Sequence, residues 1–336
     1  MRINHNTFQR LTSDLSKLVT AVAVCLGALA ADSVKADDDS WKAAFSPLPE
    51  SAPSTDNPLT PEKIALGKSL YFDTRLSKNR KMSCNTCHNV ANFGVDNEPT
   101  SPGHLGERGG RNSPTVFNAA LHVAQFWDGR AKDVEAQALG PILNPIEMGM
   151  ESDAQVIERL KDDPKTIAAF KAAFPDQQDP LTYANIGKAI GAYERTLLTP
   201  SRFDDYLKGD KSALTPQEIE GAKLFVQTGC TACHMGATLG GSMYQKLGLV
   251  KEYQTKDMGR FEATKVESDK KFFKVPSLRN VTKTAPYLHD GSVKTIEEAV
   301  SLMGEYQLGK QLTQEQVASI VTFLGSLTAT KPPTID

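Results

Sequence analysis

Two short cysteine and histidine motifs carry the clearest chemistry in this chain of 336 residues. Each has two cysteines separated by two residues and followed at once by a histidine, and the copies are Cys84-Asn85-Thr86-Cys87-His88 and Cys230-Thr231-Ala232-Cys233-His234. The C-x-x-C-H spacing is the attachment motif of c-type haem. Both thiols lie on one helical turn, where each can add to a vinyl group of one porphyrin, and the histidine then binds the iron. The motifs predict two covalently bound haems.

Paired cysteines also form disulfides and zinc sites, so these alternatives were compared with haem attachment. A lone C-x-x-C would leave them open, together with a redox dithiol. None of them explains a histidine directly after each pair. The fifth cysteine, Cys25, lies in an apolar N-terminal run. A lipid-anchored cysteine is one interpretation of Cys25, although the apolar run continues past it.

The N-terminal residues predict export. A basic start precedes the run LVTAVAVCLGALA at residues 18–30, which has the length of a signal-peptide core and is short for a membrane span. Val34-Lys35-Ala36 places smaller residues at the two usual cleavage positions. We expect residues 1–36 to be removed, which leaves a periplasmic protein without a membrane span; a retained anchor is the alternative. A net charge of −2 argues against a nucleic-acid partner.

The chain repeats itself around the two motifs, and the repeats contain the elements that must position them. Leu59-Thr60-Pro61 opens one copy and Leu214-Thr215-Pro216 opens the other, with threonine suited to the N-cap and proline to the first helical position. Thr215 and Glu218 also have capping-box spacing. Gly67 and Gly221 follow at a similar distance in the two copies. Each copy therefore predicts a helix before its haem motif.

A second helix closes each copy with a row of apolar residues on one face. These rows are Ile186, Ala189, Ile190, Tyr193 and Leu197 in the first copy and Val317, Ile320, Val321, Leu324 and Leu327 in the second. Alternating strand patterns are few. The sequence thus predicts a mostly α fold of two cytochrome c-like domains, each built around one covalently bound haem. We place them at residues 37–200 and 201–336, with a polar C-terminal tail that is loose or packs on the first domain.

The ligand on the far side of each iron decides whether a haem transfers electrons or reacts with a small molecule. Beyond the motif histidines, the mature chain offers His104, His122 and His289. His104 lies in a glycine-rich stretch, where a ligand could swing away from the iron; a solvated loop histidine is the alternative.

Four methionines are candidates for the second iron, and each could instead be core filler. They are Met235, Met243, Met258 and Met303. Met235 directly follows the motif histidine and points the wrong way. Met303 precedes the last helix, where a returning loop could cross the haem face. The residues alone do not decide among the remaining three.

Several further motifs follow one another in an order that resembles the bacterial di-haem cytochrome c peroxidases. Besides the haem pair and the His104 loop, they are Phe126-Trp127-Asp128-Gly129-Arg130, Asn144-Pro145-Ile146-Glu147-Met148 and Met303-Gly304-Glu305-Tyr306-Gln307-Leu308-Gly309. The resemblance covers the chain from about Leu59 to the end. It implies a periplasmic enzyme that reduces hydrogen peroxide to water.

The resemblance also implies roles for residues of the first half. The haem on Cys84, Cys87 and His88 is the peroxidatic one. His104 is its distal ligand in the oxidised resting enzyme and leaves when the second haem is reduced. Glu147 is the acid/base residue of the peroxide pocket, and Gln137 is its neighbour.

In the second half, the haem on Cys230, Cys233 and His234 is implied to be the electron entry site. Met303 is its sixth ligand. By the same resemblance, Trp127 lies between the haems and His289 lies near the edge of the second haem. A calcium ion between the domains is implied at Asn112, Thr284 and Pro286.

The implied partners are hydrogen peroxide, a small cytochrome c or blue copper electron donor, and a second copy in a homodimer. Two rival functions stay open at this point. A di-haem electron carrier would have permanent ligands on both irons and no pocket carboxylate. A relative that oxidises side chains of a partner protein would use a tyrosine as the sixth ligand of the second haem, and Tyr306 lies close to Met303 in the sequence.

Overall fold

Helices joined by long loops make up most of the described chain. The computed structural model describes residues 39–331, so the expected signal peptide at residues 1–36 lies outside the described residues. The α-helices are α2 (Pro61–Tyr71), α3 (Cys84–Cys87), α4 (Val134–Leu143), α5 (Asp153–Lys161), α6 (Pro164–Ala173), α7 (Tyr183–Glu194), α8 (Arg202–Leu207), α9 (Pro216–Thr228), α10 (Phe261–Thr264), α11 (Ile296–Leu308) and α12 (Gln314–Gly325). The 3-10 helices are η1 (Asp39–Ala44), η2 (Thr74–Leu76), η3 (Val90–Asn92), η4 (Ala119–Leu121), η5 (Cys230–Ala232), η6 (Glu267–Asp269) and η7 (Val281–Lys283). The predicted mostly α fold is confirmed.

One small antiparallel sheet accompanies the helices. It pairs β1 (Tyr244–Lys246) with β2 (Phe272–Lys274), and Tyr244 lies opposite Lys274. Within residues 39–331, no helix is both long enough and apolar enough to cross a bilayer.

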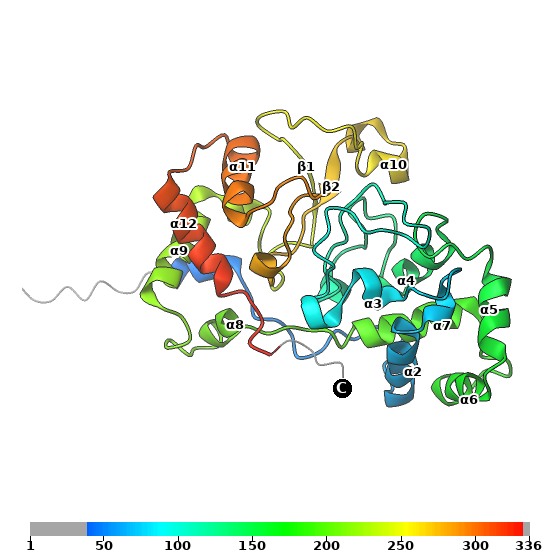
Figure 1. Ribbon diagram of the computed structural model, residues 1–336. Helices are drawn as coiled ribbons and strands as arrows, with labels where there is room; N and C mark the ends of the chain where they lie inside the picture. Colours follow the sequence, from blue (N-terminus) through cyan, green and yellow to red (C-terminus); the bar gives the residue numbers. More distant parts are fainter. Residues whose placement is uncertain (1–38, 332–336) are drawn as a thin grey trace, which may run out of the picture. The chain divides into compact units, whose positions relative to one another are not determined.

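The first group of helices surrounds α7. Apolar side chains from α2, α4, α5, α6 and α7 form one buried cluster, in which α7 contacts both α2 and α4 (Figure 1). The predicted apolar face of α7 is buried, with Ile186, Ala189 and Ile190 inaccessible to solvent. Burial of a large apolar side chain stabilises a fold by about 1.5–3 kcal/mol, so this face holds the first half together.

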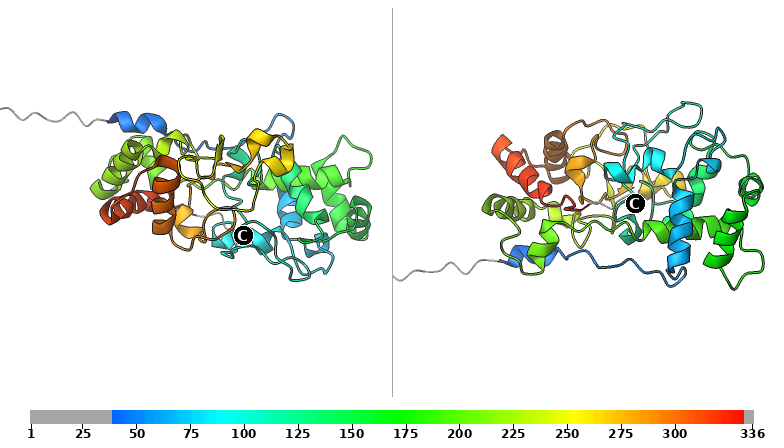
Figure 2. Two further views of the ribbon diagram at one scale, coloured as in Figure 1. Left: turned by 90° about the horizontal axis from the view of Figure 1, so that it is seen from above. Right: turned by 60° about the horizontal axis from the view of Figure 1, so that its bottom comes forward.

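The second group contains α8, α9 and α12. Phe323 of α12 packs edge-on against Phe203 and Phe225, with ring centroids 5.2 and 5.4 Å apart. Ile320, Leu324 and other side chains of α12 complete this second cluster. The two groups stay separate in every view, and loops fill the region between them (Figures 1 and 2).

The repeated glycines mark the helix crossing in each half. An added Cβ at Gly67 of α2 would lie 1.8 Å from the carbonyl oxygen of Ala189 in α7. A Cβ at Gly221 of α9 would lie 2.2 Å from the carbonyl oxygen of Ser319 in α12. Only glycine permits such close backbone approach. The internal repeat thus corresponds to one helix crossing built twice.

The predicted N-caps of α2 and α9 are confirmed. The Thr60 side chain accepts a hydrogen bond from the Lys63 N–H. Thr215 and Glu218 form the expected capping box at the start of α9. These contacts satisfy backbone donors at the helix ends, and a typical cap contributes about 1 kcal/mol.

The segment at residues 41–48 packs with the second group, although the sequence assigned it to the first domain. Trp41 stacks on Tyr206 with ring centroids 6.0 Å apart. The Leu48 N–H donates to Asp204 Oδ1 at 2.7 Å. The described chain therefore starts on the second helical group, and the residues after position 48 lead to α2.

The described part of the C-terminal tail meets the predicted domain boundary near Pro200. Ala329 pairs with Ser201, and its N–H donates to Asn280 Oδ1 at 2.8 Å. The boundary itself stays a prediction.

Candidate functional site

The first cysteine pair occupies the single turn of α3. The Ser83 N–H donates to Thr86 Oγ1 at 3.0 Å at the start of this turn, and the His88 N–H donates to the Cys84 carbonyl at 2.9 Å at its end. His88 Nδ1 lies 3.0 Å from the Pro114 carbonyl oxygen. That contact favours a proton on Nδ1 and leaves the lone pair of Nε2 for a metal.

The second pair has the same local arrangement. Gly229, in the left-handed conformation at φ 100°, ends α9 and starts η5 with Cys230. His234 Nδ1 lies 3.0 Å from the Leu239 carbonyl oxygen. Burial lowers the pKa of both His88 and His234, which keeps each imidazole neutral as a ligand must be.

The four cysteines of the motifs lie in apolar surroundings. Burial raises the pKa of Cys84 well above its usual value and raises that of Cys87 and Cys230 to about 11. Within residues 39–331, none of the four cysteines forms a disulfide. The disulfide alternative therefore finds no support in the described structure.

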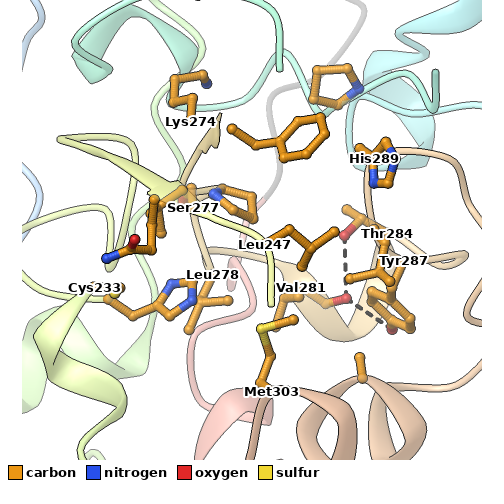
Figure 3. Close-up of a pocket in the computed structure, with 18 of the residues that line it drawn as sticks. Cys233, Leu247, Lys274, Ser277, Leu278, Val281, Thr284, Tyr287, His289 and Met303 are labelled. Carbon is orange, nitrogen blue, oxygen red and sulfur yellow. Dashed lines mark hydrogen bonds between the residues drawn. The ribbon is translucent and has the colours of Figure 1, made fainter. Parts of the chain in front are cut away.

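The second motif opens onto a cavity whose wall combines residues that are far apart in the sequence. The predicted site residues in this wall are Asn112, Trp127, Cys230, Cys233, His234, Thr284, Pro286, His289 and Met303. Apolar side chains such as Leu278 and Val281 line much of the remaining wall (Figure 3). An apolar cavity with a histidine and a methionine in its wall fits a haem with these two axial ligands.

Met303 differs from the other methionines considered from the sequence. It lies on α11, not on a returning loop as expected, and its sulfur points into the cavity (Figure 3). Met235 is exposed, and Met243 and Met258 do not belong to the cavity wall. Met303 as the sixth ligand stays a prediction, and its position supports it.

Tyr306 lies outside the cavity wall. Its ring packs edge-on against Tyr253, with centroids 5.6 Å apart, and Lys251 Nζ lies 4.8 Å from the Tyr306 ring centroid. This position gives no support to a tyrosine ligand.

The glycine-rich loop brings His104 to the segment that carries Glu147. The His104 N–H donates to the Glu147 carbonyl at 2.8 Å, and Asn79 Nδ2 donates to the His104 carbonyl at 2.7 Å. The imidazole packs on Gly149, where an added Cβ would lie 2.2 Å from His104 Cε1. His104 Nδ1 is buried and has no hydrogen-bond partner among the described residues.

Glu147 lies half-buried just after α4. Asn144 Nδ2 donates to Glu147 Oε1 at 2.9 Å. Burial raises the pKa of Glu147, while the charge of Arg130 and the Asn144 hydrogen bond partly oppose this shift. Gln137 lies on α4, also half-buried, on the helix that leads into this segment.

Two hydrogen bonds link the loops of Trp127, Asn112 and His289. Trp127 Nε1 donates to the Asn112 carbonyl at 2.9 Å, and the Asn112 N–H donates to the His289 carbonyl at 2.7 Å. The His289 ring packs at a tilt against Phe273, with ring centroids 4.5 Å apart. A shift of any of these three loops would therefore disturb the other two.

The residues predicted to bind calcium offer amide and carbonyl oxygens, and they do not form a cluster of acidic side chains. Asn112 uses Nδ2 to donate to the Glu98 carbonyl at 2.9 Å, which leaves its Oδ1 available. Within the described residues, no hydrogen bond reaches the Thr284 or Pro286 carbonyl, and no group of three acidic, histidine or cysteine side chains could hold a metal. Neutral oxygens of this kind suit calcium.

The sequence did not predict a partly buried ion cluster around Arg111. Its guanidinium contacts Asp128 at 2.6 Å, Asp257 at 2.7 Å and Glu262 at 2.9 Å. The cluster joins the loops that carry Asn112 and Trp127 to α10 and the segment before it. Its sequence signal is weak, because Asp257 and Glu262 lie 146 and 151 positions from Arg111 along the chain.

Comparisons with known proteins cover both halves of the chain. The family model for di-haem cytochrome c peroxidase matches residues 61–212, and that for cytochrome c matches residues 218–328. The cytochrome c551 peroxidase of Pseudomonas aeruginosa is 49% identical over 302 residues, which cover 88% of this chain and 87% of the relative. The cytochrome c551 peroxidase of Nitrosomonas europaea is 47% identical over 281 residues, which cover 82% and 83%. These matches agree with the predicted pair of cytochrome c-like domains.

A solved structure shows the same fold. The crystal structure of a MauG-like protein associated with microbial copper homeostasis matches with a TM-score of 0.76 and 30% identity. The match covers 84% of this chain and 94% of that protein.

Proposed function

This chain belongs to the di-haem cytochrome c peroxidase family, and on that premise we propose how it reduces hydrogen peroxide. The reaction consumes two electrons and two protons for each peroxide and releases two waters. When bound, the two haems supply one-electron redox chemistry, and the iron beside His88 supplies the place where peroxide reacts. Cys84, Cys87 and His88 hold the first haem, and Cys230, Cys233, His234 and Met303 hold the second.

One observation carries the proposal: His104 and Glu147 lie together. The backbone hydrogen bond of 2.8 Å between them joins the loop ligand to the acid/base candidate. A di-haem electron carrier would need neither a carboxylate here nor a distal histidine on a separate loop. The arrangement therefore favours a site where His104 makes room for peroxide and Glu147 handles its protons.

Glu147 acts as a base and then as an acid. Its carboxylate takes a proton from the near oxygen of peroxide and returns that proton to the far oxygen as the O–O bond breaks. Burial raises the pKa of Glu147 above its usual value, which brings its proton affinity closer to that needed for both steps. Gln137 is placed as a neighbour that orients peroxide.

His104 acts as a gate that responds to the redox state. His104 itself contacts the first half through the hydrogen bonds of its backbone with Glu147 and Asn79 and through the packing of its ring on Gly149. Reduction at the second site shifts the balance between two loop positions, and His104 then leaves. The chain of contacts from His289 through Asn112 to Trp127 couples the second cavity to the first half.

Trp127 offers the electron a route between the two sites. The electrons come from a small cytochrome c or a blue copper protein that docks briefly near the second motif. The calcium ion bound through Asn112, Thr284 and Pro286 holds the loops between the halves. The N-terminal pattern supports a periplasmic location, and the family supports a homodimer.

Steady-state kinetics of the purified holoprotein test the proposal. Reduced cytochrome c or reduced blue copper protein is mixed with the enzyme, and donor oxidation is followed with and without peroxide. Peroxide-dependent oxidation of two donor molecules per peroxide is expected. Donor oxidation that stops after the haems are filled, with peroxide unchanged, would identify an electron carrier instead.

A further inference from the structure

Lys274 and His122, one buried and one partly buried, lie in the wall of the second cavity, and neither has an acidic partner within residues 39–331. Lys274 Nζ lies 3.1 Å from His122 Nδ1, and both residues line the cavity. We propose that Lys274 and His122 form a carboxylate-binding site that holds one propionate of the second haem. The inference rests on the proposed function, since it requires a haem on Cys230 and Cys233.

Lys274 is the main reason to expect an anion here, because a buried cation needs a counter-charge. Lys274 is only 6% exposed, and no Asp or Glu of the described chain forms an ion pair with it. Burial alone lowers its pKa to about 8. Burying an unpaired ammonium is costly, and a lysine in this position gains most from an anion brought by a ligand.

His122 supplies a second unused donor. Because Lys274 Nζ can only donate, His122 Nδ1 must accept, which places the imidazole proton on Nε2. That Nε2 is buried and has no partner among the described residues. Burial and the charge of Lys274 lower the pKa of His122 far below its usual value, so the ring stays neutral and keeps this tautomer.

The surrounding backbone fixes both side chains in place. A Cβ at Gly241 would lie 2.3 Å from His122 Cδ2, so the ring packs directly on that glycine. The Lys274 N–H donates to the Trp127 carbonyl at 2.7 Å, and the Val123 N–H donates to the Gly241 carbonyl at 2.8 Å. The pair is thus built where the loop of Trp127 meets β2.

A haem propionate matches this site chemically. A carboxylate has two oxygens, so it can pair with the lysine and also accept the histidine N–H. The rest of the cavity wall is mainly apolar and suits the porphyrin ring, and Lys274 lies on the side of the cavity away from Met303 (Figure 3). A positive charge here also favours the reduced haem, which suits an electron entry site.

Two spectroscopic readouts test the site in the haem-loaded protein. Resonance Raman spectroscopy follows the propionate bending modes, and a potentiometric titration gives the midpoint potential of the Met303 haem. In Lys274→Met, the propionate mode should shift and the ratio of reduced to oxidised haem at a fixed potential should fall about tenfold, which is about 59 mV for one electron. Lys274→Arg should restore most of both values.

Lys246→Met is the matched control, because Lys246 lies on the paired strand β1 and is exposed. It should leave both readouts unchanged. His122→Phe keeps a ring on Gly241 and removes the donor, so it should shift the propionate mode even if Lys274→Met does not fold. A haem spectrum of each protein reports whether the second haem is attached.

Unchanged propionate modes and potential in Lys274→Met and His122→Phe, with both haems attached, would overturn this site alone. A wild-type potential that responds to added acetate, without any change of the propionate modes in the variants, would mean that the pair binds a solvent anion, and it would also overturn the proposal. A wild-type protein without haem at the second motif would contradict the proposed function itself.

Discussion

Replacing Glu147 with glutamine removes a proton carrier while leaving its surroundings intact. Asn144 Nδ2 donates to Glu147 Oε1 at 2.9 Å, and the amide oxygen of glutamine can accept the same bond. The side chains have nearly equal volume. The His104 contact uses the Glu147 backbone carbonyl, so it does not depend on the side chain. We therefore expect both haems to attach and the fold to persist.

The expected loss of turnover follows from the role of the carboxylate. Acid–base catalysis by a positioned group contributes about 10²–10⁴-fold, so kcat should fall by that factor, or about 2.7–5.4 kcal/mol at 1.36 kcal/mol per tenfold. Glu147 must begin as a carboxylate to accept the first proton. Because burial raises its pKa, wild-type activity should decline as the pH falls toward that raised pKa, and the variant should lack this decline.

The assay compares kcat at several pH values for wild type, Glu147→Gln and a control, with a fixed reduced donor and saturating peroxide. Glu151→Gln is the control, because Glu151 is exposed and its carboxylate pairs with Lys78 Nζ at 2.9 Å on the surface. The control should keep wild-type turnover. An unchanged kcat in Glu147→Gln, with full haem content, would refute the acid/base assignment.

Three further predictions concern the gate, the helix crossing and the calcium ion. His104→Ala should give a five-coordinate, high-spin first haem in the fully oxidised protein and activity without prior reduction; an unaltered oxidised spectrum would contradict the gate. Gly67→Ala should lower the free energy of unfolding by roughly 1–3 kcal/mol in denaturant titrations, because its Cβ would lie 1.8 Å from the Ala189 carbonyl oxygen. An unchanged unfolding midpoint would show that α2 and α7 move apart to accept the methyl group at no cost, which would contradict the prediction. Chelation of calcium should lower peroxidase activity and added calcium should restore it, whereas activity that persists after complete calcium removal would argue against the site at Asn112.

Local patterns in the sequence predicted the parts of the fold that depend on neighbouring residues. The C-x-x-C-H motifs, the Thr60 and Thr215 caps and the apolar face of α7 follow from spacings of a few residues, and the structure has the caps and the buried face as predicted. The repeated Gly67 and Gly221 were visible as a repeat. The reason for these glycines, a close crossing with a later helix, could be seen only in the structure.

Contacts between distant segments were beyond the reach of these patterns. Lys274 and His122 are 152 positions apart, and neither stands out in its own stretch of sequence. Trp41 belongs by position to the first half but packs with the second cluster. Met303 could not be separated from its rivals by spacing, because the choice depends on which helix face borders the cavity.

In the proposed mechanism, one electron opens a peroxide site that His104 controls. The most direct test is a combined absorption and spin-resonance titration of the purified holoprotein, first fully oxidised, then after one electron, each before and after peroxide. We expect two six-coordinate haems at the start, and a first haem that becomes open and reacts with peroxide once the second is reduced. Two haems that stay six-coordinate and inert to peroxide after one electron would contradict this mechanism.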